Sequence, residues 1–101
     1  MAKGYFIITE DIKDQAGMGA CAGKALPTII QQGGKPVVVD SSYETLEGTW
    51  HGQQTIILEF ESVEAAKKWY NSDEYQAVIG ERHAAADSNA VIVAGFEMPG
   101  A

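Results

Sequence analysis

Apolar and polar residues along the chain follow two different periods, which predict strands and helices in turn. In Gly4–Thr9 the apolar side chains alternate between two faces, as they do in a β-strand. Further strands are expected at Pro36–Asp40, Thr55–Phe60 and Asn89–Phe96, which are short, apolar and rich in β-branched residues. Ser41–Gly52 follows neither period and is expected to form a loop or a frayed hairpin.

Helical spacing predicts a first helix that begins near Asp11 and Asp14 and ends at Gly33-Gly34. Its apolar side chains share one face and comprise Met18, Ala22, Ala25 and Ile29, with Cys21, Leu26 and Ile30 alongside. Three glycines inside it, Gly17, Gly19 and Gly23, each cost about 0.8–1 kcal/mol relative to alanine, and Pro27 removes a helical hydrogen bond. Two interpretations stay open: close packing on a sheet with a kink at the proline, or room for a ligand.

A second helical region begins at Ser62, a good N-cap, and is interrupted at Asn71-Ser72-Asp73. Ser72 caps a further helical segment that runs through Arg82. The resulting order, β-α-β-β-α-β, is that of the ferredoxin-like α+β fold, an antiparallel sheet with its helices on one face. One such domain over residues 1–97 and a C-terminal tail at 98–101 account for the 101 residues.

The expected strands are apolar on both faces, although helices cover only one face of such a sheet. The second face therefore needs a partner, and a self-complementary homodimer is the commonest solution. Hydrophobic residues make up 46% of the chain, which fits a folded domain and argues against disorder.

Acidic residues outnumber basic ones by 14 to 7, which argues against nucleic acid and anionic membranes as partners. No apolar run approaches a membrane span, and the N-terminus lacks the features of a signal peptide. The single cysteine, Cys21, favours a reducing, cytoplasmic location and packing as a small hydrophobe. His51 and His83 show no metal-ligand spacing, and no cofactor motif occurs.

Candidate chemistry centres on Arg82, which helical spacing places on the packed face with Tyr75. An inward arginine needs either a structural carboxylate or an anionic ligand to satisfy its donors. Glu59, a carboxylate in an apolar strand, fits a structural ion pair or a catalytic acid or base equally well. His83 fits a solvent-facing residue or a group that moves protons near neutral pH.

A second group of candidates comprises residues of the loop between the middle strands and two tyrosines elsewhere in the chain. Glu47, Trp50 and the neighbouring His51 fit either a pocket wall or a loop pinned to the core or to a dimer partner. Tyr5 and Tyr70 fit either core residues with one satisfied hydroxyl or donors to a ligand.

Three stretches of the sequence resemble a known family. They are Ile29–Pro36 with its glycine pair, the Leu-Glu-Gly-Thr-Trp run within Glu44–Trp50, and the signature formed by Leu58–Ser62, Ala65-Ala66, Trp69–Gln76 and Arg82. Together, over nearly the whole chain, they resemble the bacterial family known as domain of unknown function 1330, a member of the dimeric α+β barrel superfamily.

The resemblance implies a homodimer whose two sheets meet face to face, and no established reaction. Superfamily relatives include cofactor-free monooxygenases, lactone isomerases, haem-degrading enzymes and ligand-binding regulatory domains, and the fold alone does not choose among them. Carried over by position, the matching candidates are Glu47, Trp50, Glu59, Trp69, Tyr70, Ser72, Tyr75 and Arg82, of which Trp69, Tyr70, Ser72 and Tyr75 are expected to serve mostly capping and core packing. Gln54, Met18 and Cys21 depart from the family pattern and imply a roomier, less cationic pocket.

Two hypotheses about function follow. The first is a pocket between helices and sheet that binds a small acidic or phenolic metabolite, with Arg82 holding its oxygen. If the ligand is turned over, Glu59 or His83 moves protons in an isomerase- or monooxygenase-like reaction without a cofactor. The second is a non-catalytic structural or regulatory module with a shallow pocket.

Overall fold

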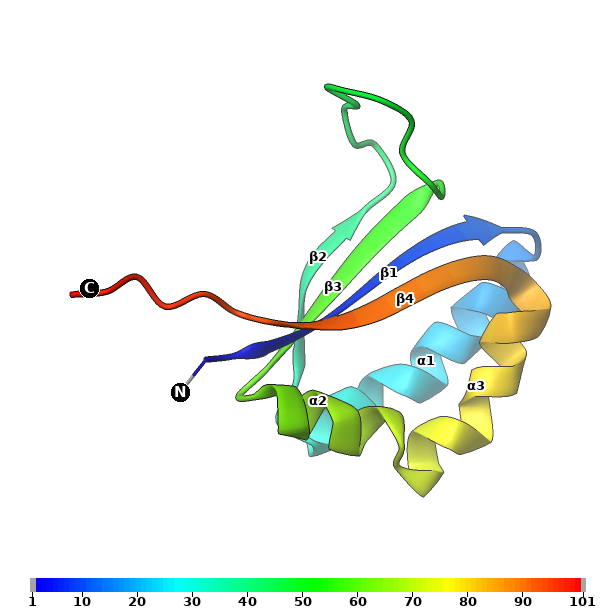
Figure 1. Ribbon diagram of the computed structural model, residues 1–101. Helices are drawn as coiled ribbons and strands as arrows, with labels where there is room; N and C mark the ends of the chain where they lie inside the picture. The colour runs from blue at the N-terminus through cyan, green and yellow to red at the C-terminus, as the bar shows by residue number, and fades with distance from the viewer. Residues whose placement is uncertain (1, 101) are drawn as a thin grey trace.

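The computed structural model describes residues 2–100, so Met1 of the expected domain and Ala101 of the expected tail lie outside the described residues. Four strands form one antiparallel sheet in the order β2-β3-β1-β4 (Figure 1). Their bounds are β1 (Gly4–Ile12), β2 (Lys35–Asp40), β3 (Gln54–Phe60) and β4 (Ala86–Ala94). The four-stranded antiparallel sheet and the α+β class are as the sequence predicts.

All three helices, α1 (Gln15–Gln31), α2 (Val63–Tyr70) and α3 (Asp73–Ala85), lie on one face of the sheet (Figure 1). Asp14 and Ser72 begin α1 and α3, and their side chains accept hydrogen bonds from backbone N–H groups of the first turn. Ser62 does the same for α2. These caps satisfy donors that have no partner inside the helix, which fixes where each helix begins.

The sequence prediction ends the last strand at Phe96, whereas β4 ends at Ala94, and two further boundaries differ by three residues. Asp11, expected near the start of a helix, lies in β1, which continues to Ile12. The last strand begins at Ala86 instead of Asn89. Both differences have one cause, because β1 and β4 remain paired in register from Gly4 to Ile12 and this pairing satisfies the backbone of residues too polar to suggest a strand.

The core lies between the sheet and the helices α2 and α3, and an aromatic cluster dominates it. Trp69 is fully buried and contacts the rings of Phe6, Phe60 and Tyr75 at centroid distances of 5.1, 5.5 and 4.2 Å. Its indole N–H donates to the Thr28 hydroxyl of α1 at 3.0 Å. Aromatic packing of this kind accounts for the core role expected of Trp69 and Tyr75.

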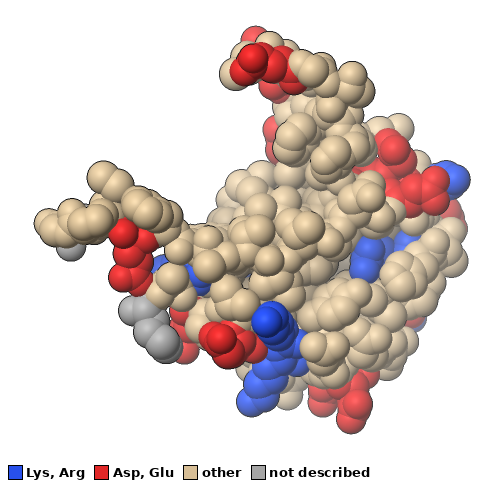
Figure 2. Space-filling view, in the orientation of Figure 1, with Lys and Arg blue, Asp and Glu red and all other residues tan. Residues whose placement is uncertain are grey.

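The opposite face of the sheet has no helix over it within the described residues. Register and alternation place on it four residues of β1, three of β3, three of β2 and four of β4, namely Tyr5, Ile7, Thr9, Asp11, Thr55, Ile57, Glu59, Lys35, Val38, Asp40, Asp87, Asn89, Val91 and Val93. The apolar residues lie at the centre of the face and the charged ones toward its ends. Val91 remains 54% exposed. The loop of residues 41–53 and the tail after β4 project beyond this face (Figure 1), and the surface between them in Figure 2 carries almost no charged side chains.

Candidate ligand-binding site

A cavity of about 380 Å³ lies between α1 and the helix-facing side of the sheet. Its walls are mostly apolar, as in small-molecule sites generally. Strands β1, β2 and β3 contribute Phe6, Ile8, Ile12, Pro36, Val39, Gln54, Ile56 and Leu58, and α1 contributes Gln15, Met18, Gly19, Cys21, Ala22, Ala25, Leu26 and Ile29. Trp69, Tyr75, Arg82 and Glu10 complete the lining.

The composition of α1 keeps this space open. The helix packs mainly against α3 rather than against the strands, and the cavity-facing positions include the small residues Gly19, Ala22 and Ala25. A Cβ atom added at Gly19 or Gly23 would meet no atom within 4 Å. Close packing of these two glycines on the sheet is therefore wrong as an explanation, and Gly19 instead leaves room in the cavity wall.

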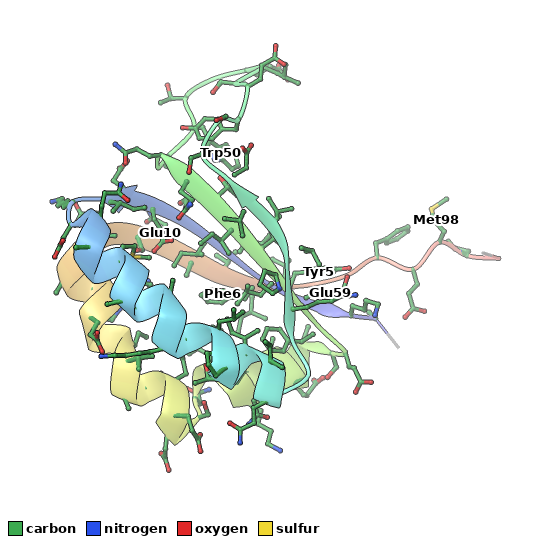
Figure 3. All side chains as sticks on the ribbon, turned by 180° about the vertical axis from the view of Figure 1, so that it is seen from behind. Tyr5, Phe6, Glu10, Trp50, Glu59 and Met98 are labelled. Atoms are coloured by element: carbon green, nitrogen blue, oxygen red, sulfur yellow. The ribbon has the colours of Figure 1, made fainter. Side chains whose placement is uncertain are left out.

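The polar side chains of the cavity gather at the end where α1 begins. Glu10 is 0% exposed and Arg82 is 7% exposed. The Arg82 Nε donates to the hydroxyl of Tyr75 at 3.2 Å, and both groups are buried. Figure 3 shows Glu10 beside the first turns of α1. Glu10 and Arg82 are the two charged residues in the lining.

Burial dominates the electrostatics of this end of the cavity. It raises the pKa of Glu10, although the positive charge of Arg82 and the hydroxyl of the cross-strand neighbour Ser88 work in the opposite direction. Burial also raises the pKa of the Tyr75 hydroxyl and of the Cys21 thiol, so both remain protonated at neutral pH. The Cys21 thiol faces the carbonyl of Val78 at 3.9 Å, and its raised pKa disfavours a role as nucleophile.

Arg82 lies on the packed side of its helix, as the spacing predicts. No carboxylate among residues 2–100 forms an ion pair with it within 4.0 Å. The positive charge of Arg82 nevertheless acts to lower the pKa of Glu10. The structural ion pair, one of the two interpretations offered by the sequence, is therefore not formed at hydrogen-bonding distance among the described residues, and the role of Arg82 as a ligand anchor stays a prediction.

Glu59 and Tyr5 lie on the sheet face opposite the cavity, at the other end of the strands from Glu10 (Figure 3). The Tyr5 hydroxyl donates to the Glu59 carboxylate at 3.2 Å. Lys3 and Lys35 approach the same carboxylate at 3.6 and 3.7 Å. These contacts form a surface network, so Glu59 and Arg82 do not share a cavity, and the catalytic role predicted for Glu59 stays a prediction.

Two of the loop candidates, Trp50 and His51, border a second hollow, of about 560 Å³, on the uncovered face. His51 stacks on Trp50 at a centroid distance of 5.0 Å, and its Nδ1 lies 2.7 Å from the hydroxyl of Thr9. The Trp50 indole donates to the Thr55 hydroxyl at 3.0 Å, while the ring stays 47% exposed. Glu47 is exposed in the same loop, away from the cavity.

His83 and Tyr70 border a further surface hollow, which also includes Arg82 and Ser88 and is separate from the cavity beside α1. The His83 side chain is exposed and Tyr70 is half-buried. Among the residues predicted to carry chemistry, Arg82 thus lines the cavity beside α1, and Trp69 and Tyr75, which are expected to serve mostly core packing, line it as well. The roles predicted for the others stay predictions.

Sequence reasoning missed Glu10, the most buried charged residue described. The signal was present in the alternation of the first strand, because Phe6, Ile8 and Glu10 are two residues apart and therefore share one face. The acidic run Glu10-Asp11 instead indicated the end of the strand and the approach of a helix. Extending the strand by one more period would have placed this carboxylate in the core.

These features define a ferredoxin-like α+β protein with an apolar cavity between its first helix and its sheet. Residues 3–96 match the domain of unknown function DUF1330, and the chain belongs to this family. Among curated proteins, none shows significant similarity to the chain.

Solved structures with the same fold have low sequence identity to the chain. The RPA0582 protein of unknown function from Rhodopseudomonas palustris is 18% identical, with a TM-score of 0.79 over 96% of this chain and 85% of that one. SnoaB, a cofactor-independent oxygenase from Streptomyces nogalater, is 10% identical, with a TM-score of 0.65 over the full length of both. A dimeric ferredoxin-like protein of unknown function from Thermobifida fusca is 8% identical, with a TM-score of 0.53 over 92% and 91%. At these identities the likeness concerns the fold.

Proposed function

We propose that the chain is a homodimeric small-molecule-binding protein of the bacterial cytoplasm, with one pocket in each protomer between α1 and the sheet. The observation that carries the proposal is the cavity itself, because about 380 Å³ of apolar space beside a buried arginine lies within the size range of small-ligand sites. A ligand that binds here would displace water from mostly apolar walls, which favours binding.

The lining indicates the class of ligand. Nearly all walls are apolar, which favours a compact aromatic or alicyclic body. Arg82 at one end favours an oxygen that carries or develops negative charge, such as a phenolic or acidic oxygen. The overall charge of −7 repels anions, so this preference depends on the local field of Arg82.

Two glycines of α1 provide a matched pair of variants to test the pocket. Gly19 lines the cavity and Gly23 does not, while a Cβ added at either position would have open space around it. We expect Gly19→Leu to fill the cavity and abolish the thermal shift caused by small phenols and aromatic acids. Gly23→Leu is expected to bind them like the unmodified protein. Equal binding by both variants, or no binding of any compound by the unmodified protein, would contradict the proposal.

The homodimer rests on the uncovered sheet face. Its centre consists of apolar residues from three strands, including Ile7, Ile57, Val91 and Val93, and large apolar side chains of the projecting loop and tail, such as Leu46 and Phe96, are also exposed. A soluble monomer rarely exposes a continuous apolar patch of this kind. A second copy of the chain is the occupant we propose, and the fold neighbour from Thermobifida fusca is itself dimeric.

Sedimentation tests the dimer directly. We expect the protein at micromolar concentration to sediment at twice the chain mass of 10.8 kDa. Val91→Glu places a charge on the uncovered face and is expected to give monomers, because an unpaired buried charge is costly. Ile30→Glu, on exposed α1, is the matched control and should stay dimeric. A stable monomer of the unmodified protein would refute the proposed interface.

A further inference from the structure

Glu10 is an orphan carboxylate aimed at the cavity. It is fully buried, it lines the cavity wall, and neither of its carboxylate oxygens has a hydrogen-bond partner among residues 2–100. Buried carboxylates are normally paired or hydrogen-bonded, because an unsatisfied one loses its hydration without compensation. The cavity that Glu10 lines is one place from which such a partner can come.

The neighbouring groups do not fill that role. Arg82 donates its Nε to Tyr75 and forms no ion pair with Glu10 within 4.0 Å. Ser88 faces Glu10 across the β1–β4 pair and its hydroxyl acts to lower the pKa of Glu10, but it forms no hydrogen bond of standard geometry with the carboxylate. The cavity beside them is large enough for a ligand that provides a donor. Glu10 thus presents a hydrogen-bond acceptor to the cavity, and Arg82 presents a positive charge to it.

We propose that Glu10 accepts the proton of a phenol or enol hydroxyl on the bound ligand, while Arg82 holds the resulting oxyanion. This inference rests on the proposed ligand pocket and names the substrate class within it. The ligand O–H bond breaks, its electron pair stays on the ligand oxygen, and the proton forms an O–H bond with the Glu10 carboxylate. Charge and atoms balance without an oxidant, a reductant or a cofactor.

Charge counting explains why a hydroxyl suits this site better than a carboxylic acid. An aromatic acid is already ionised at neutral pH and would bring a second negative charge beside Glu10 with only Arg82 to compensate, so it should bind more weakly than a phenol. A phenol or enol brings its own proton and shares it with Glu10. The site then holds one positive charge, one negative charge and one mobile proton, which are the components of a proton-transfer reaction.

The other titratable groups facing this end of the cavity keep their protons. Tyr75 of α3 and Cys21 of α1 both have raised pKa values because of their burial. Ser88 of β4 does not titrate. A change in proton number when a ligand binds therefore reports on Glu10 and the ligand.

The pH dependence of 4-nitrophenol binding tests the proposal, because the ionised probe is yellow and easily followed. Above the pKa of the free probe and that of Glu10, binding to the unmodified protein should take up one proton, so Kd should rise about tenfold per pH unit. Glu10→Gln should bind the phenolate directly on Arg82 with a Kd that does not change with pH in this range. Glu59→Gln, on the other sheet face, is the matched control and should keep the tenfold slope.

A second measurement needs no variant at all. Calorimetric titration of the unmodified protein in two buffers of different ionisation enthalpy counts the protons taken up, and we expect one per protomer. A count of zero, or an unchanged tenfold slope in Glu10→Gln, would overturn the role of Glu10 while leaving the pocket intact. No binding of 4-nitrophenol would also overturn it, and the Gly19→Leu comparison with aromatic acids then decides the pocket separately.

Discussion

Alanine substitutions at the three glycines of α1 test whether the wall of the cavity is open. At Gly19 and Gly23 an added Cβ meets no atom within 4 Å, so only the backbone effect remains. Each change should stabilise the protein by about 0.8–1 kcal/mol, the helix-propensity difference between glycine and alanine. Gly17 differs, because its added Cβ would lie 2.5 Å from the Asp14 carboxylate that caps the helix through the Gly17 N–H. Losing that cap costs about 1 kcal/mol and offsets the gain.

Thermal and urea unfolding at one fixed protein concentration measure these differences, since a dimer's stability depends on concentration. For a domain of this size, each stabilising change should raise Tm by roughly 4–8 °C per kcal/mol, and Gly17→Ala should leave Tm nearly unchanged. A destabilisation of about 1 kcal/mol or more by Gly19→Ala would show that α1 packs closely there. In that case the cavity, and the ligand proposal with it, would be refuted.

Two further predictions concern Glu10 and the contact between Gly34 and Phe60. Because burial raises the pKa of Glu10, the folded state binds its proton more tightly than the unfolded state, whose pKa is 4.5. The free energy of unfolding should therefore decrease as pH rises from 4.5 through the raised pKa of Glu10. Glu10→Gln should remove this decrease from the pH profile of stability. An identical profile in the variant would contradict the burial of the charge. Gly34→Ala should destabilise the protein by about 1–3 kcal/mol in urea unfolding. The reason is that the added alanine Cβ would lie 2.7 Å from Cζ of the fully buried Phe60. A neutral effect would show that the Phe60 ring has space to move.

The period of the apolar residues predicts most of the fold, because strands and helices in this chain differ clearly in spacing. The prediction from this period fails where the pairing between two strands determines the structure. Asp11 and Ser88 lie in strands although neither resembles a strand residue, since β1 and β4 satisfy each other's backbone along their full length. A pairing between segments more than seventy residues apart leaves no local pattern to read.

The candidate site was predictable only in part. Arg82 follows from helical spacing alone, because its position relative to Tyr75 puts both on the buried face. Glu59 and Glu10 look alike in sequence, each a carboxylate beside apolar strand residues, yet they face opposite sides of the sheet. Which face the helices cover depends on the three-dimensional packing, so the sequence indicates a carboxylate of interest without deciding which one.

The irregular edge strand β2 bears on how such molecules associate. Its register shifts between Pro36 and Val38, so Pro36 and Val39 both line the cavity while Val38 faces the other side. The shift and the missing N–H of Pro36 interrupt the row of unpaired backbone groups that an outer strand would offer to a neighbouring sheet. Growth of a continuous intermolecular sheet along this edge is therefore discouraged. The geometry of β2 thus disfavours fibre growth at this edge, while face-to-face pairing of two sheets stays available.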